Sequence, residues 1–330
     1  MTDHIEYLSQ ILDTPVPDMY MLSNDENIYA RHRKKNYYRN YHRVILKRTG
    51  SAKIRILNVP NKYLKRVQRK ILERILYELP VSDYAMAYVK GKSLRDNAVL
   101  HTGKDIVVKL DIKHFFDSID GLMVYRVFNQ TGLSKQAVIL LTELCIYQNK
   151  LPQGAPTSPY IANLVLKDFD SEIGKWCASH GITYTRYCDD MTFSGSKDDL
   201  CSDDLIKFVK DKLYHKGLFS LNENKTAVVA SSQQQRVTGT VVNDKPEVPK
   251  SLRRSIRQEV YYCRKFGLES HVAHSYPELS PEKYLHKLIG KISYTLQINP
   301  DNSELKEYYS YLLQLSKAVN EKVSVIASDD

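Results

Sequence analysis

The chain has 330 residues, 42% of them apolar, which is enough for a packed core and excludes a disordered protein. Its five cysteines are widely spaced and form no C-x-x-C pair, which argues against a disulfide framework or a cysteine zinc site. No apolar run approaches the roughly 18 residues of a membrane span, and the N-terminus has no secretory leader pattern. We therefore expect a soluble cytosolic protein with no membrane partner.

Positive charge is concentrated in the first quarter of the chain. Lys and Arg total 48 against 38 Asp and Glu, a net charge of +10. Between Arg31 and Arg74, sixteen Lys and Arg residues accompany one acid, Glu73. Such a block favours an anionic partner, because each phosphate that a cation neutralises releases counterions. Tyrosines among these cations suit stacking against bases, and the alternative is a solvated basic face.

The N-terminal third predicts a hairpin followed by a helix, after a polar start. Residues 43–60 contain two alternating runs around a Thr-Gly-Ser turn at 49–51. After Asn61 an apolar stripe recurs every three or four residues, which is typical of an amphipathic helix. Its members are Leu64, Val67, Ile71, Ile75 and Leu79.

The middle of the chain alternates between strand and helix patterns. A β-branched run ends on Asp111, and a helix is expected over 134–147. A proline-rich loop then leads to Thr157, which we expect to cap one helix that continues to Gly181. Further elements are expected in chain order: a hairpin over 182–194 that turns at 188–190, a helix over 202–217, and strands at 226–230 and 237–242 that complete a sheet.

The last eighty residues are helical, basic and rich in tyrosine. Three helical patterns follow Lys250, and Pro246 and Pro249 mark the joint before them. We expect these helices to form a small bundle of their own.

Three carboxylates are the strongest chemical signal. Asp111 ends a strand, while Asp189 and Asp190 occupy a hairpin tip, and strands that pair lie about 4.8 Å apart. Converging carboxylates repel one another, and two Mg²⁺ ions would remove that conflict and clamp the oxygens of a phosphoryl transfer. The alternative for an isolated Asp-Asp pair is a polar turn.

Four segments in order give the chain its resemblance to reverse transcriptases. "YCDD" at 187–190 resembles the Tyr-x-Asp-Asp box of that family, and "LDIKHFFDSI" at 110–119 resembles the box with the other metal-binding aspartate. "LPQGAPTSP" at 151–159 resembles the loop and helix start beside the incoming nucleotide, and "GLFSLNENKT" at 217–226 resembles the box with an Asn and a Lys after the palm helix. "NAVLH" at 97–101 and "VTG" at 237–239 resemble elements of bacterial retron enzymes.

The resemblance implies a metal site. Asp111 and Asp189 would bind both Mg²⁺ ions, with the carbonyl of Ile112 as an extra ligand. Asp190 would complete the acidic cluster, as the least strict of the three.

It also implies a nucleotide site. Lys53 and Arg55 would hold the triphosphate, and Gln153 would lie against the incoming nucleotide. Phe116 would exclude a ribose 2′-OH, with an ordinary core Phe as the alternative. Lys225 could protonate the leaving pyrophosphate, although a solvated lysine is equally compatible with the pattern.

RNA contacts are implied at two places. Asn97 and His101 would order the fingers or contact template RNA, and a structural histidine is the alternative for His101. Val237, Thr238 and Gly239 would grip the primer and recognise a structured RNA. The basic C-terminal helices would hold the duplex by its shape.

The fold implied is α+β, a right-hand polymerase with an antiparallel palm sheet covered by helices. Its divisions would be fingers with an N-terminal extension over 1–100, completed by about 145–160, palm over 101–245 and helical thumb over 246–330. The expected reaction is DNA synthesis on an RNA template from dNTPs. Retron resemblance implies a dedicated non-coding RNA as template and primer, RNA-linked DNA as product, and a separate effector protein in anti-phage defence.

Two alternatives stay open at this point. One is another bacterial reverse transcriptase, from a group II intron or a diversity-generating or abortive-infection system; the chain is expected to be too short for a maturase extension or an RNase H domain. The other is a catalytically idle RNA-binding scaffold. The intact aspartates argue against the scaffold, because a pure binder gains nothing from negative charges that face phosphates.

Overall fold

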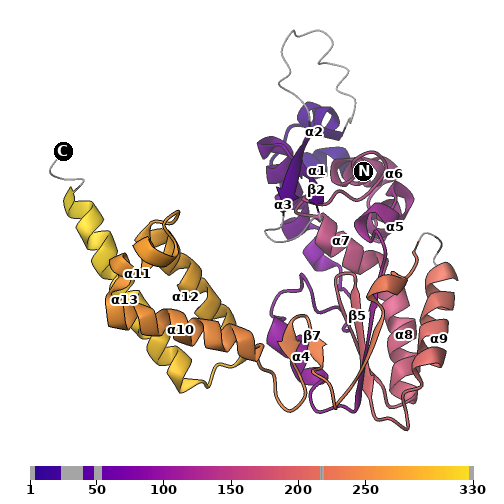
Figure 1. Ribbon diagram of the computed structural model, residues 1–330. Coiled ribbons are helices and arrows are strands. Elements are labelled where there is room, and N and C mark those ends of the chain that lie inside the picture. The colour runs from indigo at the N-terminus through magenta and orange to yellow at the C-terminus, as the bar shows by residue number, and fades with distance from the viewer. Residues whose placement is uncertain (1–3, 24–39, 48–53, 216, 218, 327–330) are drawn as a thin grey trace. The chain divides into compact units, whose positions relative to one another are not determined.

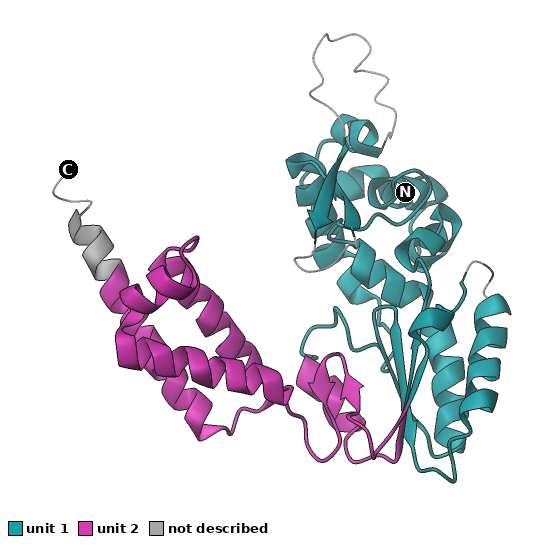
Figure 2. Cartoon of the chain, in the orientation of Figure 1, with its two compact units in different colours: residues 1–92, 108–228 teal, residues 93–107, 229–330 magenta. Residues whose placement is uncertain are grey.

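The computed structural model describes residues 4–23, 40–47, 54–215, 217 and 219–326. It divides into two compact units, coloured separately in Figure 2. Unit 1 comprises Met1–Lys92 and Val108–Val228, and unit 2 comprises Ser93–Val107 and Val229–Asp330. The expected division into fingers, palm and thumb stays a prediction.

The main sheet has four strands in the order β4-β5-β3-β6. Their bounds are Thr183–Tyr187 for β4, Asp190–Gly195 for β5, Ile106–Asp111 for β3 and Ala227–Ala230 for β6. β4 and β5 form the predicted antiparallel hairpin, with Tyr187 opposite Asp190. β3 ends on Asp111, as its sequence predicted. The α+β class is confirmed.

Two helices, α8 (Lys167–Ser179) and α9 (Ser202–His215), lie side by side along this sheet in Figure 1. The single helix expected from Ser158 to Gly181 is wrong, because α7 (Ser158–Val165) ends before Leu166 and α8 starts after it. Leu166 is fully buried at the break. On α8, Asp170 faces the sheet and binds Arg186 on β4.

The rest of unit 1 is mainly helical around a hairpin. β1 (Tyr41–Lys47) and β2 (Ile54–Pro60) are antiparallel as predicted, and α3 (Lys62–Arg74) follows, capped by the Asn61 side chain. The remaining helices are α1 (His4–Leu12), α2 (Val16–Ser23), η2 (Leu76–Glu78), α5 (Gly121–Asn129) and α6 (Lys135–Cys145).

The helices α1 and α2 were not predicted from the sequence. Each is shorter than three turns, so the apolar period repeats too few times to stand out from a polar background. Both are held by burial in the tertiary structure, where Leu8, Leu12 and Met19 are fully enclosed.

Unit 2 holds a small hairpin and the C-terminal helices. β7 (Arg236–Val237) and β8 (Thr240–Val241) form a separate two-stranded sheet, so the expectation that 237–242 would complete the main sheet is wrong. Thr238 and Gly239 both have positive φ, and this two-residue turn pairs Val237 directly with Thr240.

The C-terminal bundle has one helix more than predicted. It comprises α10 (Lys250–Phe266), α11 (Leu268–Ser275), α12 (Pro281–Ile298) and α13 (Ser303–Ile326), while α4 (Leu94–Leu100) also belongs to unit 2. Val260, Leu285 and Leu288 lie in the bundle core. No helix in the described part of the chain is long and apolar enough to cross a membrane.

Candidate active site

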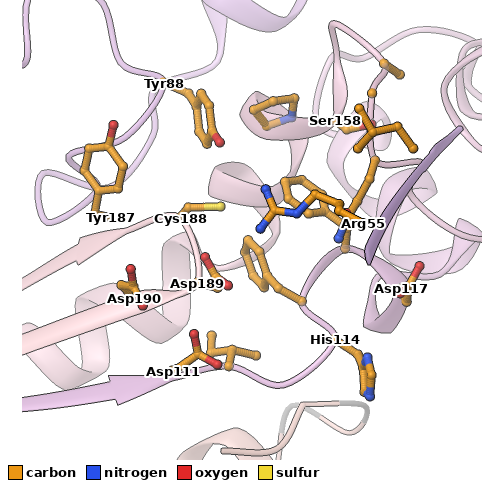
Figure 3. A pocket seen from close by; sticks show the side chains of 18 of the residues that line it. Arg55, Tyr88, Asp111, His114, Asp117, Ser158, Tyr187, Cys188, Asp189 and Asp190 are labelled. Atoms are coloured by element: carbon orange, nitrogen blue, oxygen red, sulfur yellow. The ribbon is translucent and has the colours of Figure 1, made fainter. Parts of the chain in front are cut away.

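The three predicted aspartates meet in a pocket of unit 1 with a volume of about 810 Å³. Asp111 comes from the end of β3, while Asp189 and Asp190 come from the turn between β4 and β5. One carboxylate oxygen from each residue lies within 4.8 Å of the others. Figure 3 shows the three carboxylates together at the strand ends, with Arg55 extending into the same pocket.

The turn that presents the pair is tight. Cys188 has a φ of 61°, an uncommon conformation for a residue with a side chain, and its own side chain is buried. Burial raises the pKa of the Cys188 thiol to about 12, so this cysteine is not a reactive thiolate at neutral pH. Directly beyond the turn, the amide of Ile112 donates to the Asp189 carbonyl over 3.0 Å, which ties the turn to the end of β3.

Asp111 is the buried member of the cluster, with 3% of its surface exposed. Two groups after α9 hold its carboxylate: Asn222 Nδ2 donates over 3.0 Å and Lys225 Nζ over 2.5 Å. Lys225 belongs to the short helix η4 (Glu223–Lys225). Desolvation lowers the pKa of Lys225, but the hydrogen bond and charge of Asp111 outweigh it, so the pKa is raised and the ammonium stays charged.

Asp190 carries the electrostatic cost of the cluster. Desolvation, followed by the charges of Asp189 and Asp111, raises the pKa of Asp190 to about 6. Lys225 relieves only part of this repulsion, and three carboxylates in that state suit a hard divalent cation, which would lower the pKa of Asp190 again by binding the charged form. The residues present therefore fit a divalent metal centre.

The residues expected around the nucleotide lie in this same pocket. Arg55, Phe116, Gln153 and Lys225 all line it, while Lys53 lies outside the described residues. Phe116 starts the short helix η3 (Phe116–Ser118) and is half-buried. Its neighbour Phe115 is buried, with its ring against that of Phe219.

The loop that carries Gln153 is fixed against the hairpin that carries Arg55. The amide of Asn58 donates to the Gln153 carbonyl over 2.8 Å. Gly154 has a φ of 121°, and a Cβ there would lie 3.0 Å from the Asn58 carbonyl oxygen. Only glycine fits this approach without strain, so the side of the pocket with Arg55 and Gln153 is built on two elements that hold each other.

The residues expected to contact RNA lie in unit 2, and several are enclosed. Asn97 and His101, on and after α4, are fully buried, and burial lowers the pKa of His101 to about 3. A neutral, enclosed ring fits the ordering role better than direct contact with RNA. Val237 is buried as well, whereas the turn at Thr238 and Gly239 reaches the surface.

Several residues that shape the site were not singled out from the sequence. Asn222 lies in a segment that was recognised, but its bond to Asp111 joins the residue before η4 to the end of β3, far apart in the chain. Tyr88 lines the pocket with half of its surface exposed and a φ of 61°, and no pattern in the sequence singles it out. Arg186 was read as part of an alternating strand, yet it is fully buried beside the turn.

Comparisons with known proteins agree with this geometry. Residues 45–242 match the family model for reverse transcriptase (RNA-dependent DNA polymerase). The chain is 31% identical over 300 residues to the Retron Mx65 reverse transcriptase of Myxococcus xanthus, covering 84% of this chain and 65% of that protein. It is 31% identical over 246 residues to the Retron Ec86 reverse transcriptase of Escherichia coli, covering 71% of this chain and 73% of that protein.

Among solved structures, apo telomerase from Candida tropicalis is similar to this chain with a TM-score of 0.47 and 13% identity, covering 96% of this chain and 63% of that one. A TM-score below 0.5 is too low to support an assignment, so the family is assigned from the sequence matches.

Proposed function

This chain belongs to the reverse transcriptase family, together with the retron enzymes, and we infer from that membership that it is an RNA-directed DNA polymerase. Its substrates would be dNTPs and a primed RNA. The observation that carries the inference is the meeting of Asp111, Asp189 and Asp190 in one pocket with Arg55, Phe116 and Gln153.

The acidic cluster would hold two Mg²⁺ ions, with the Ile112 carbonyl as a further ligand. Bound there, these ions would neutralise the carboxylates and clamp the attacking and leaving oxygens of an in-line displacement. The chain itself supplies the alignment: Asn222 and Lys225 hold the Asp111 carboxylate, and the Ile112 amide holds the turn before Asp190. These bonds leave little freedom in where the oxygen ligands lie.

On the nucleotide side, the guanidinium of Arg55 would pair with the triphosphate, and Gln153 would flank the nucleotide. Lys53 would add a second cation. Lys225 bonds Asp111 and remains charged, so we assign it to binding the pyrophosphate as it departs and, once released from Asp111, to protonating it.

Primer extension tests the polymerase activity. Purified protein with Mg²⁺, dNTPs and a primed RNA should make DNA, and Asp189→Asn should not. If the wild-type protein makes no DNA but binds RNA equally well with and without that substitution, the idle-scaffold alternative holds instead.

Phe116 is proposed as the residue that discriminates against ribonucleotides, because its half-buried ring lies in the pocket next to the carboxylates. Phe116→Ala should admit ribonucleotides, measured as the ratio of kcat/KM for a dNTP to that for the matching NTP. Phe115→Leu, in the neighbouring core, is the control and should leave that ratio unchanged. Equal ratios in wild type and Phe116→Ala would assign Phe116 to packing alone.

We further propose that the enzyme copies a dedicated structured non-coding RNA, which also primes synthesis, into RNA-linked DNA. Its similarity to retron enzymes supports this, as do the segments at 97–101 and 237–239. An effector protein and a part in anti-phage defence belong to the same proposal. Sequencing nucleic acid that copurifies with the protein tests it, since one abundant RNA covalently joined to DNA is expected. Only random cellular RNA would favour another bacterial reverse transcriptase.

Fingers over 1–100, palm over 101–245 and thumb over 246–330 are proposed as the functional divisions. The basic face of the C-terminal helices supports a thumb that holds the duplex: Lys250, Arg253, Arg254 and Arg257 line one pocket of unit 2.

A further inference from the structure

One charged side chain of the main sheet is completely removed from water. Arg186 lies in the middle of β4 and is 0% exposed. Its partner Asp170, on α8, is equally buried, and the two make a paired contact with Nε at 2.8 Å and Nη2 at 2.6 Å from the carboxylate oxygens. Two buried charges are costly to desolvate, so a pair of this kind is weak evidence of a gain in stability alone.

The guanidinium has a further nitrogen, and its direction is informative. Nη1 of Arg186 donates to Asn163 Oδ1 and to the carbonyl of Cys188, each over 3.0 Å. Asn163, on α7, in turn donates to the carbonyl of Ala87 over 2.8 Å. One side chain therefore joins α8, α7 and the turn before Asp189.

The bond to the Cys188 carbonyl acts on one of the two peptide groups next to Asp189. That carbonyl belongs to the planar peptide between residues 188 and 189, whereas the Asp189 carbonyl belongs to the next plane. Arg186 anchors the first plane, and the amide of Ile112 anchors the second over 3.0 Å. With both planes fixed, φ and ψ of Asp189 are fixed, and so is the direction of the Cα–Cβ bond that carries its carboxylate.

We propose that Arg186 is a positioning residue that sets the orientation of Asp189 for metal binding, a role that rests on the proposed metal-dependent function. The turn needs such an anchor because Cys188 is held at positive φ. A residue other than glycine is strained there and would relax to negative φ if nothing held it. Asp170 and Asn163 orient the guanidinium, so they act through Arg186.

Metal binding gives a test that does not depend on catalysis. Mn²⁺ binding to the full chain, followed by electron paramagnetic resonance, is compared for wild type, Arg186→Lys and Tyr184→Phe. A compact ammonium cannot span Asp170 and the Cys188 carbonyl as the planar fork does, so we expect Arg186→Lys to weaken Mn²⁺ binding about tenfold. The half-saturating Mg²⁺ in primer extension should rise in parallel, with little change in KM for dNTP.

Tyr184→Phe is the matched control. The Tyr184 hydroxyl donates over 2.8 Å to Asp170 Oδ1, the oxygen that also accepts from Arg186 Nε. This hydrogen bond lies at the Asp170 end of the network and not at the turn. Removing it disturbs the buried pair but leaves both bonds of Arg186 to Asp170, so Mn²⁺ binding should stay at the wild-type level.

Three results would overturn the inference or its basis. If Arg186→Lys binds Mn²⁺ as tightly as wild type, Arg186 has only a structural role in the core. If Tyr184→Phe loses Mn²⁺ affinity to the same extent as Arg186→Lys, the conclusion is again a structural role. If Arg186→Lys does not fold, Arg186→Met combined with Asp170→Leu leaves no buried charge and should show the same loss of metal. If wild type itself binds no Mn²⁺ and Asp189→Asn changes nothing, the proposed metal site has failed instead.

Discussion

Carboxylates are used in opposite ways in the two units. In unit 1, Asp111, Asp189 and Asp190 converge, and the charges of the other two, after desolvation, raise the pKa of Asp190 to about 6. In unit 2, the carboxylate of Glu259 on α10 faces donors. The Tyr276 and Tyr284 hydroxyls donate to it over 2.5 and 2.7 Å, and His271 Nε2 lies 2.9 Å away.

The two environments move the pKa in opposite directions. Burial by itself would raise the pKa of Glu259, but the hydrogen bonds from Tyr276, Tyr284 and His271 outweigh burial and lower it. Glu259 thus joins α10, α11 and α12 and stabilises its unit. The three aspartates in unit 1 have too few hydrogen-bond donors to offset their repulsion. Negative charge therefore remains for a cation to neutralise. The network in unit 2 suits a stabilising role, whereas the cluster in unit 1 suits the cation binding proposed for it.

The largest effect should come from Asp189→Asn. Loss of one charged ligand should reduce the rate of primer extension about a thousandfold, equivalent to about 4 kcal/mol of transition-state stabilisation. The folded protein should be no less stable, because a repulsive charge has been removed. Single-turnover extension and thermal unfolding measure the two quantities. A variant that kept more than about a tenth of the rate would contradict the assignment.

Glu259→Gln should have the reverse profile. The amide cannot accept from all three donors, so the free energy of unfolding of unit 2 should fall by about 2 kcal/mol. The chemical step, measured with saturating primer and below the unfolding temperature, should proceed at the wild-type rate. Chemical denaturation measures the stability. An unchanged midpoint would mean that the network is not a source of stability.

Asp190→Asn should stabilise the metal-free protein by about 1 kcal/mol at pH 7. This is less than the full pKa shift would give, because part of the Asp190 residue is exposed and solvent screens its charge. Its folded pKa is raised, so the wild-type protein loses stability as pH rises from about 4 to about 6 and the carboxylate ionises. The advantage of Asp190→Asn should vanish near pH 4.

Saturating Mg²⁺ should reverse the order of stability, because ligand binding stabilises only the protein that binds it. Unfolding temperatures with EDTA and with Mg²⁺ are the measurement. A variant less stable than wild type in EDTA at pH 7 would show that the cluster is not repulsive.

The smallest effect is the pH dependence of the Glu259 network. Its folded pKa is lowered, so its contribution is present above the ordinary pKa of Glu and is lost as pH falls through the folded value. The stability difference between wild type and Glu259→Gln should therefore be constant at neutral pH and shrink below about pH 4.5. Denaturation of both proteins from pH 7 to pH 3 checks this, and a difference that grew at low pH would contradict it.

Much of the site could be predicted because its signals are local. The strand that ends on Asp111 and the hairpin that presents Asp189 and Asp190 each occupy a few consecutive residues whose types determine the backbone. Gly154 could be predicted only in part. The sequence shows that the residue has no side chain, but not the close contact with the Asn58 carbonyl that requires this.

What the sequence alone determined is therefore the order of the elements and the identity of the reactive groups. The tertiary structure decided which groups meet. A charged residue in a strand pattern is normally a solvated one, and only the packing of α8 against β4 brings Asp170 to Arg186 and allows that charge to be buried. Likewise, the bond from Asn222 to Asp111 joins residues 111 positions apart. Such contacts depend on the packing of separate elements, and no local pattern records them.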